Sequence, residues 1–344
     1  MPGVAKEGGA SSSAIEDGSN RKTGGKGVKT HCKRYWWIHV LLLIIIIAVA
    51  VVPSVLLQAV PRTAQRKLDE ASLTIDGIII SNTQTDSLNM AINSTITTGG
   101  DQRATIDGFE GTMHLADVDP PLAFAKINFP ETTSDTLQTV NISQEVPITD
   151  LNAFTTFNKY LIERENVNIL VKGDTHIHVK GISRTYPVAF RKTVPLKGLN
   201  GLAGLAVTNP QVNTDQYNNF NATVQIPNPS VLILDIGNTT FTNYFNGSDI
   251  GTVYILNLVL YPGVNDYFIW ADIQQGPIVT ALTQKPYCER NGTLPFQLAG
   301  KTVINNGQPI PYFADALKAS NQSVDINIGQ AIANDIGFPI GCLP

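Results

Sequence analysis

Residues 36–52 read WWIHVLLLIIIIAVAVV, and this stretch decides how the rest of the chain is organised. After it, no Asp, Glu, Lys or Arg occurs before Arg62. A helix over residues 36–60 reaches roughly 35 Å, enough to cross a hydrocarbon layer of ~30 Å with some tilt. No polar face interrupts the run at helical spacing, which disfavours the alternative of a buried core helix. We therefore predict a transmembrane signal anchor over residues 35–60.

The segment before the span, residues 1–34, is rich in Gly, Ser and Lys and is predicted to be a disordered tail. It carries seven basic and three acidic side chains, hence +4; because the whole chain carries −4, the remainder carries −8. Basic residues beside a span favour the cytoplasm. We predict a cytoplasmic N-terminus, a charged connector over 61–70 and a large luminal or extracellular part. The acidic balance of that part argues against nucleic acid as a partner.

Sequons for N-linked glycosylation agree with this topology. Seven matches to Asn-x-Ser/Thr occur after the span and none before it. The candidate acceptors are Asn93, Asn141, Asn221, Asn238, Asn246, Asn291 and Asn321. Their spread favours a luminal or extracellular address.

Two cysteines, Cys288 and Cys342, follow the span. An oxidising compartment favours a disulfide between them, and two free buried thiols are the alternative. The loop that they would close has a stabilising effect on the order of 4 kcal/mol in the chain-entropy model.

Beyond residue 71 the sequence consists of short alternating or apolar runs separated by Asn, Gly, Pro and Asp, which predicts a mainly β fold. Val253–Tyr261 and Ile278–Leu282 are two of these predicted strands. Helical spacing appears over 151–162 and, more briefly, over 312–318. The sequences around these two helices are similar, which predicts two β-sandwich domains, 71–197 and 205–344, each with a short helix and joined by a Gly-rich linker, 198–204. One large sandwich is the alternative.

A turn in the second half carries a resemblance to a known family. Val224–Ser230 contains an Asn-Pro pair between two strands, and Asp235–Gly237 and Tyr244–Gly251 follow it. This order resembles the late-embryogenesis-abundant type 2 domain, also called the water-stress and hypersensitive-response domain. The whole arrangement is similar to fungal single-pass membrane proteins with tandem domains of this kind, a family of uncharacterised function. The resemblance implies fibronectin-III-like sandwiches that bind lipid and a location in the vacuolar membrane. It implies no catalytic residues, because the family has none in common.

No catalytic or metal-binding motif stands out, and we expect neither an enzyme nor a cofactor. Asp174, His176 and His178 would share one face of a strand. They could hold a metal ion, titrate as a histidine pair in an acidic lumen, or form a solvated strand face. The solvated face is the simplest interpretation, so no metal site is predicted.

Apolar side chains on both faces of one strand, and along one helix, need something to cover them. We predict that the strand residues pack between the two domains or line an acyl-chain groove, and that the helix residues close the sandwich core or form the lid of that groove. The residues are Phe154, Phe157, Leu161, Tyr254, Leu256 and Leu258. The sequence therefore predicts a non-enzymatic, membrane-anchored binding protein for a luminal lipid or protein partner. A structural or adhesive surface protein without a small ligand is the alternative. The vacuolar membrane is the first expected location, with the cell surface or endoplasmic reticulum as alternatives.

Overall fold

The computed structural model describes residues 27–100, 103–338 and 340–342. The chain divides into two compact units, one ending at Ala59 and the other beginning at Val60. Most of the predicted disordered tail, residues 1–26, lies outside the described residues. Residues 27–34 are helical instead, because α1 begins at Gly27. Extending an existing helix adds one hydrogen bond for each residue that is fixed, so the long apolar helix supports this polar beginning.

The predicted span lies in the helix α1 (Gly27–Ser54) and the π-helical turn η1 (Val55–Ala59). Pro53 lies inside α1 and lacks an N–H group, and the wider π turn follows it directly. One helix in the described part of the chain, Trp36–Glu70, is long and apolar enough to cross a membrane, and its most apolar window is fully exposed. This exposure argues against a core helix and is compatible with a single-pass membrane protein.

The helix α2 (Val60–Glu70) packs against the strand β9 (Thr185–Lys197). The side-chain amide of Gln65 pairs with the backbone of Ala189 as a neighbouring strand would: Nε2 donates to the carbonyl at 2.9 Å, and the Ala189 N–H donates to Oε1 at 3.0 Å. Lys192 donates to the carbonyl oxygens of Asp69 and Ala71, and burial lowers its pKa. These contacts fix the predicted connector as part of the β-rich body.

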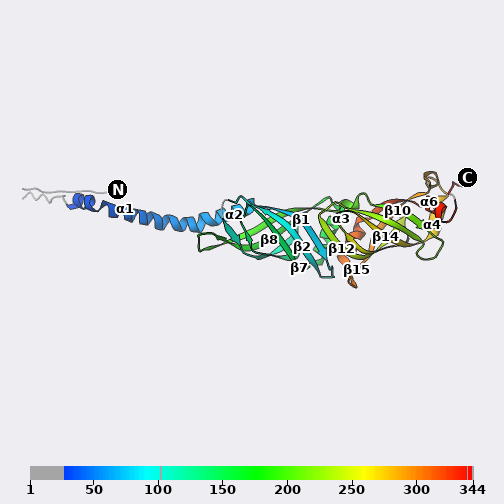
Figure 1. The fold of residues 1–344 in the computed structure, drawn as a ribbon, viewed down its shortest axis with the longest axis horizontal. Helices are drawn as coiled ribbons and strands as arrows, with labels where there is room; N and C mark the ends of the chain where they lie inside the picture. Colours follow the sequence, from blue (N-terminus) through cyan, green and yellow to red (C-terminus); the bar gives the residue numbers. More distant parts are fainter. Residues whose placement is uncertain (1–26, 101–102, 339, 343–344) are drawn as a thin grey trace, which may run out of the picture. The chain divides into compact units, whose positions relative to one another are not determined.

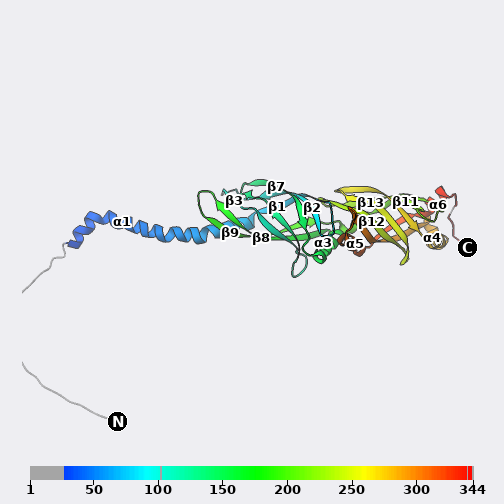
Figure 2. The same ribbon diagram turned by 90° about the horizontal axis from the view of Figure 1, so that it is seen from below.

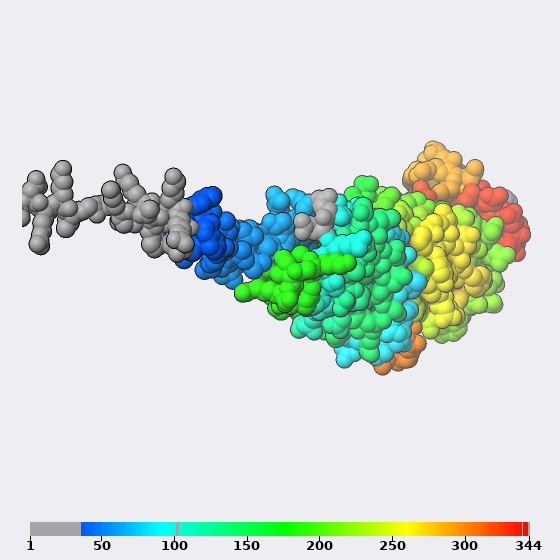
Figure 3. Space-filling view, turned by 60° about the vertical axis from the view of Figure 1, so that its left-hand side comes forward, coloured from blue at the N-terminus to red at the C-terminus, as the bar shows by residue number. Residues whose placement is uncertain are grey.

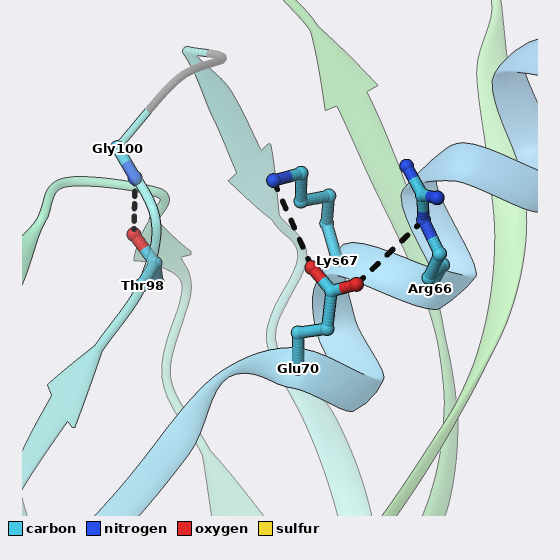
Figure 4. Close-up of polar contacts among 5 residues, drawn as sticks. All are labelled: Arg66, Lys67, Glu70, Thr98 and Gly100. Atoms are coloured by element: carbon cyan, nitrogen blue, oxygen red, sulfur yellow. Dashed lines mark hydrogen bonds and ion pairs between the residues drawn. The ribbon is translucent and has the colours of Figure 1, made fainter.

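Glu70, at the end of α2, lies between two basic side chains of the same helix (Figure 4). Its carboxylate is 3.7 Å from both Arg66 Nε and Lys67 Nζ. The Arg66 and Glu70 side chains are largely exposed and Lys67 is partly exposed, so these ion pairs contribute little to stability. The hydrogen bonds of Gln65 and Lys192 therefore hold α2 in place more firmly than its ion pairs do.

Two sheets make up the body, and the mainly β fold is confirmed (Figure 1, Figure 2). Among the described residues the larger sheet has eleven strands and the smaller has six. The larger sheet contains β1 (Ser72–Ser81), β2 (Ser87–Thr97), β7 (Leu137–Pro147), β10 (Ala206–Val212), β11 (Phe220–Asn228), β12 (Leu232–Phe245), β13 (Ser248–Leu260), β14 (Gly263–Ile273), β15 (Thr293–Asn305), β16 (Gln308–Pro309) and β17 (Gln322–Asn327). The smaller contains β3 (Ala104–Ile106), β4 (Phe109–Leu115), β5 (Leu122–Phe129), β6 (Thr132–Thr133), β8 (Asn166–Val179) and β9.

A parallel pairing between β1 and β12 joins the two halves of the body. Ile78 pairs with Leu232 and Ile80 with Leu234, so strands from 71–197 and from 205–344 belong to one sheet. The buried apolar side chains of both halves also form one continuous cluster. The segment 198–204 is packed rather than open, because a Cβ at Gly198 would lie 2.2 Å from the Arg164 carbonyl. The division into two domains stays a prediction.

Both predicted helices are present as α3 (Leu151–Glu163) and α5 (Pro311–Ser320). Asp150 caps α3 by accepting a hydrogen bond from the Ala153 N–H at 2.9 Å. The predicted strand over 278–282 is wrong, since it lies in the helix α4 (Gln275–Leu282). A short apolar run fits either period, and here Pro277 stands in the first turn, where a helix tolerates it. The remaining short helices are η2 (Asn200–Leu202), η3 (Tyr287–Arg290) and α6 (Ile328–Asp335).

The Asn-Pro turn between β11 and β12 is built around the side chain of Asn228, which is 1% exposed. Its Nδ2 donates to the carbonyls of Leu232 at 2.8 Å and Leu260 at 3.3 Å. Its Oδ1 accepts from the N–H and the hydroxyl of Ser230 at 3.0 and 2.6 Å. One buried amide therefore ties the turn to the end of β13.

We expect Asn228→Ala to lower the free energy of unfolding by about 2–3 kcal/mol, because it leaves buried polar groups of the turn without partners. Asn89→Ala is the matched control, since Asn89 is an exposed strand residue, and it should change stability by less than about 0.5 kcal/mol. Thermal unfolding of the full chain in lipid nanodiscs measures both. If both substitutions changed the free energy of unfolding by the same small amount, water would be replacing the hydrogen bonds that Asn228 makes.

Candidate functional site

The candidate site is an apolar cavity of about 110 Å³ inside the second half of the body. Strands β10 to β15 and β17 form its walls, and β10 also contacts β17, so the sheet curls around the cavity. The helices α4 and α6 cover it, and both views place them near the C-terminus of the described chain (Figure 1, Figure 2). Its walls are therefore drawn from almost every strand of this half.

Regularly spaced apolar side chains of α6 and α4 form the helical side of the cavity wall. Ile328, Ile332 and Ile336 follow one another at intervals of four residues, so they face the cavity from one side of α6 and its C-terminal end. Ile278 and Val279 project from α4. Val279 and Ile336 are also 54% and 45% exposed. The cavity is therefore open to solvent where α4 and α6 meet it.

A close backbone contact and a disulfide hold α4 and α6, together with their flanking segments, in place beside the cavity. A Cβ at Gly329, at the start of α6, would lie 2.4 Å from the Asn291 carbonyl. Cys288, in η3 just after α4, is bonded to Cys342, which follows α6; the Cα atoms are 5.1 Å apart. This disulfide joins the two cysteines that the sequence suggested as a pair. It ties together the chain segments that flank the covering helices.

Asn243 is the exceptional residue of the cavity wall. It lies in β12 between Gly251 of β13 and Leu298 of β15, and only 6% of it is exposed. Its Oδ1 is buried without a hydrogen-bond partner in the described part of the chain. Buried polar atoms in proteins are nearly always paired, so this oxygen needs an explanation.

The other polar residues of the wall are satisfied. Asn219 exchanges two hydrogen bonds with the backbone of Ile273, at 2.8 and 2.9 Å. Gln275 donates to the Asn213 carbonyl, and Asn213 in turn donates to Asn218. None of the described residues that line the cavity is charged. The site is therefore suited to an uncharged, largely apolar molecule, because an ion would lose its hydration there without compensation.

The structure does not bring the six predicted groove residues together. Phe154 and Phe157 lie in an aromatic cluster with Phe124. Leu161 and Leu258 line a second, smaller cavity of about 40 Å³. Tyr254 and Leu256 face outward, and Leu256 is 56% exposed. Neither cavity wall includes Phe154, Phe157, Tyr254 or Leu256.

The outward residues belong to an apolar patch on β13 and β14, which we call the outer patch: Tyr254, Leu256, Val264, Phe268 and Trp270. Tyr254 and Trp270 are cross-strand neighbours whose rings stack at 3.8 Å. Val264 and Phe268 are 67% and 65% exposed. The chain around residue 250, coloured yellow, forms part of the surface seen on the right of Figure 3.

The predicted histidine face is a solvated face of β8, which pairs with β9 on one side and with β3 and β4 on the other. Asp174, His176 and His178 are exposed, while Thr175 and Ile177 between them are buried. His178 Nε2 is 2.8 Å from Asp107 Oδ1. Within the described residues, no group of three or more His, Cys, Asp or Glu side chains could hold a metal ion.

The predicted glycosylation sites lie mainly at the surface. Six of the seven acceptors are exposed, and Asn221, in β11 between β10 and β14, is half-buried. Asn246 and Asn291 lie in turns with positive φ angles. The folded body therefore leaves room for a glycan at most of these positions.

The comparison with protein families gives one match. The family described as "Protein of unknown function (DUF3712)" matches residues 122–243, which run from β5 to Asn243 of β12. Its description names no activity. No curated protein matches the chain.

Three solved structures show remote similarity to this chain. A transglutaminase from red sea bream is 11% identical, with 78% of this chain and 32% of that chain covered and a TM-score of 0.23. A cross-linked bacterial adhesin from Mobiluncus mulieris is 8% identical, with coverages of 67% and 80% and a TM-score of 0.20. A chaperone–tip adhesin complex of CFA/I fimbriae biogenesis is 10% identical, with coverages of 70% and 96% and a TM-score of 0.13. This chain spans about a third of the transglutaminase. At such TM-scores, none of these similarities carries an argument about function.

Proposed function

We propose that this protein is a non-enzymatic, single-pass membrane protein whose β-rich body binds a lipid or another small apolar molecule. The observation that carries the proposal is the apolar cavity of about 110 Å³, open beside Val279 and Ile336. Ligand sites in proteins are typically concave and apolar, with few polar groups that fix orientation. The walls of this cavity have that composition.

The proposal includes the topology. The N-terminus would be cytoplasmic and the body luminal or extracellular, and the basic tail, the seven sequons and the disulfide support this. The resemblance to fungal membrane proteins with tandem late-embryogenesis-abundant type 2 domains favours the vacuolar membrane over the cell surface or the endoplasmic reticulum.

Copurified lipid tests the binding function. The full chain is extracted into copolymer nanodiscs, and molecules bound to it are identified by mass spectrometry. Ile332→Trp should fill the cavity from α6 and remove the bound molecule. Ala333→Trp is the matched control, because Ala333 is exposed on the same helix and lies outside the cavity wall. A wild-type protein that carries no more lipid than Ile332→Trp would refute the proposal.

Glycosylation tests the topology. We expect limiting digestion with peptide N-glycosidase to lower the apparent mass of the full chain in several steps. Asn291→Gln should remove one step, whereas Asn306→Gln should remove none. Both residues begin exposed Asn-Gly turns with similar φ angles, 53° and 48°, but only Asn291 belongs to a sequon. Protease added outside sealed vesicles should trim only the tail; digestion of the body would reverse the proposed orientation.

The alternative function is a structural or adhesive surface protein, and the outer patch favours it. Large exposed apolar surface on a soluble body often marks a site of protein contact. Phe268→Asp should abolish adhesion without affecting lipid copurification if this alternative holds. The cavity variant Ile332→Trp should then have no effect on adhesion.

A further inference from the structure

The side-chain amide of Asn243 belongs to the cavity wall, and its Oδ1 has no hydrogen-bond partner in the described part of the chain. Asn243 lies on the inward face of β12 between the buried side chains of Phe241 and Phe245, at a position where an apolar residue would also fit. A leucine there would have the same number of side-chain heavy atoms and no polar group to desolvate. An amide at this point is favourable only if something in the cavity hydrogen-bonds to it.

We propose that the cavity binds an uncharged molecule with a compact apolar body and one hydroxyl group, which hydrogen-bonds to the side-chain amide of Asn243. This inference rests on the proposed binding function and specifies its ligand. A hydroxyl donates to Oδ1 and can also accept from Nδ2, so it suits either orientation of the amide. The uncharged wall excludes an ionised head group at this end of the ligand.

The volume of the cavity and the polarity of its wall limit which ligands fit. An engineered protein cavity of ~150 Å³ holds benzene, so about 110 Å³ holds a group of slightly smaller size. A single water molecule would need two to four polar partners, whereas Val253, Phe296 and Leu298 share the wall with Asn243. An aliphatic alcohol satisfies both the apolar wall and the amide.

The direction of binding follows from burial. Asn243 is buried in the cavity wall, whereas Val279 and Ile336 of the same wall are exposed to solvent. The hydroxyl therefore enters first, and a longer apolar chain can extend past α4 and α6. This arrangement places the recognised group where competing water is excluded.

Photolabelling of the full chain in nanodiscs tests the inference. Two probes carry the same diazirine, one on hexanol and one on hexane, and their aqueous concentrations are measured in each sample. We expect both to label peptides of α4 and α6, with hexanol half-saturating at roughly three- to tenfold lower concentration than hexane. Asn243→Leu should abolish this preference. Asn89→Leu, at an exposed strand position, should retain it.

A second measurement covers the case in which Asn243→Leu does not fold. In the wild-type protein, unlabelled hexanol should compete with the probe, whereas methyl pentyl ether, which has no hydroxyl donor, should compete at least threefold less well. Equal competition, or equal labelling by both probes, would overturn the recognition of a hydroxyl and leave the binding function intact. Absence of labelling at α4 and α6 by either probe would overturn both.

Discussion

Phe157→Ala is expected to lower the free energy of unfolding by about 3–5 kcal/mol, because it removes an aromatic ring from a closely packed core. Phe157 is 4% exposed, and its ring stacks on Phe124 at 4.7 Å. Phe154, one turn earlier in α3, contacts Tyr312 of α5 edge-on at 4.9 Å. The cluster therefore joins a helix of the first half to a helix of the second.

Thermal unfolding of the full chain in nanodiscs checks this. The midpoint should fall by on the order of 10 °C. Leu151→Ala at the exposed start of the same helix is the control and should cost about 1 kcal/mol or less. If α3 were the lid of a groove, Phe157→Ala would instead have a small effect on stability and a large one on ligand binding.

Loss of the disulfide is expected to lower stability by about 4 kcal/mol, because Cys288 and Cys342 close a loop with a sequence separation of 54. Cys342→Ser and treatment with a reductant should have similar effects on the unfolding midpoint. Cys32→Ser is the control, since Cys32 lies outside this loop.

The position of the loop adds a second expected effect. It encloses α6, which covers the cavity together with α4, so its loss should also increase proteolytic cleavage after residue 328. Unchanged stability in Cys342→Ser would mean that close contacts such as Gly292 against Gly329 hold α6 without the covalent bond.

The sequence predicted the elements whose patterns are long and uninterrupted. The apolar run of 36–52 and the stripe of Phe154, Phe157 and Leu161 correspond to α1 and α3. The helix α4 was missed because five apolar residues do not distinguish a helix from a strand. The parallel pairing of β1 with β12 was missed because register between distant strands leaves no local pattern.

The cavity was not predicted either, although two of its signals are visible in the sequence. Ile328, Ile332 and Ile336 recur at the interval of a helix face, and Asn243 interrupts an inward row that includes Phe241 and Phe245. Neither signal shows by itself that the two segments face each other. That depends on the curl of the sheet between β10 and β17.

The pairing of β1 with β12 also has a consequence for biosynthesis. During synthesis at ~5–20 residues per second, Ile78 emerges roughly ten to thirty seconds before its partner Leu232. For that interval one edge of the nascent β1 remains open, with Ile78, Ile79 and Ile80 free to pair with any other extended chain. The newly made protein should therefore depend on chaperones until the second half has been translated.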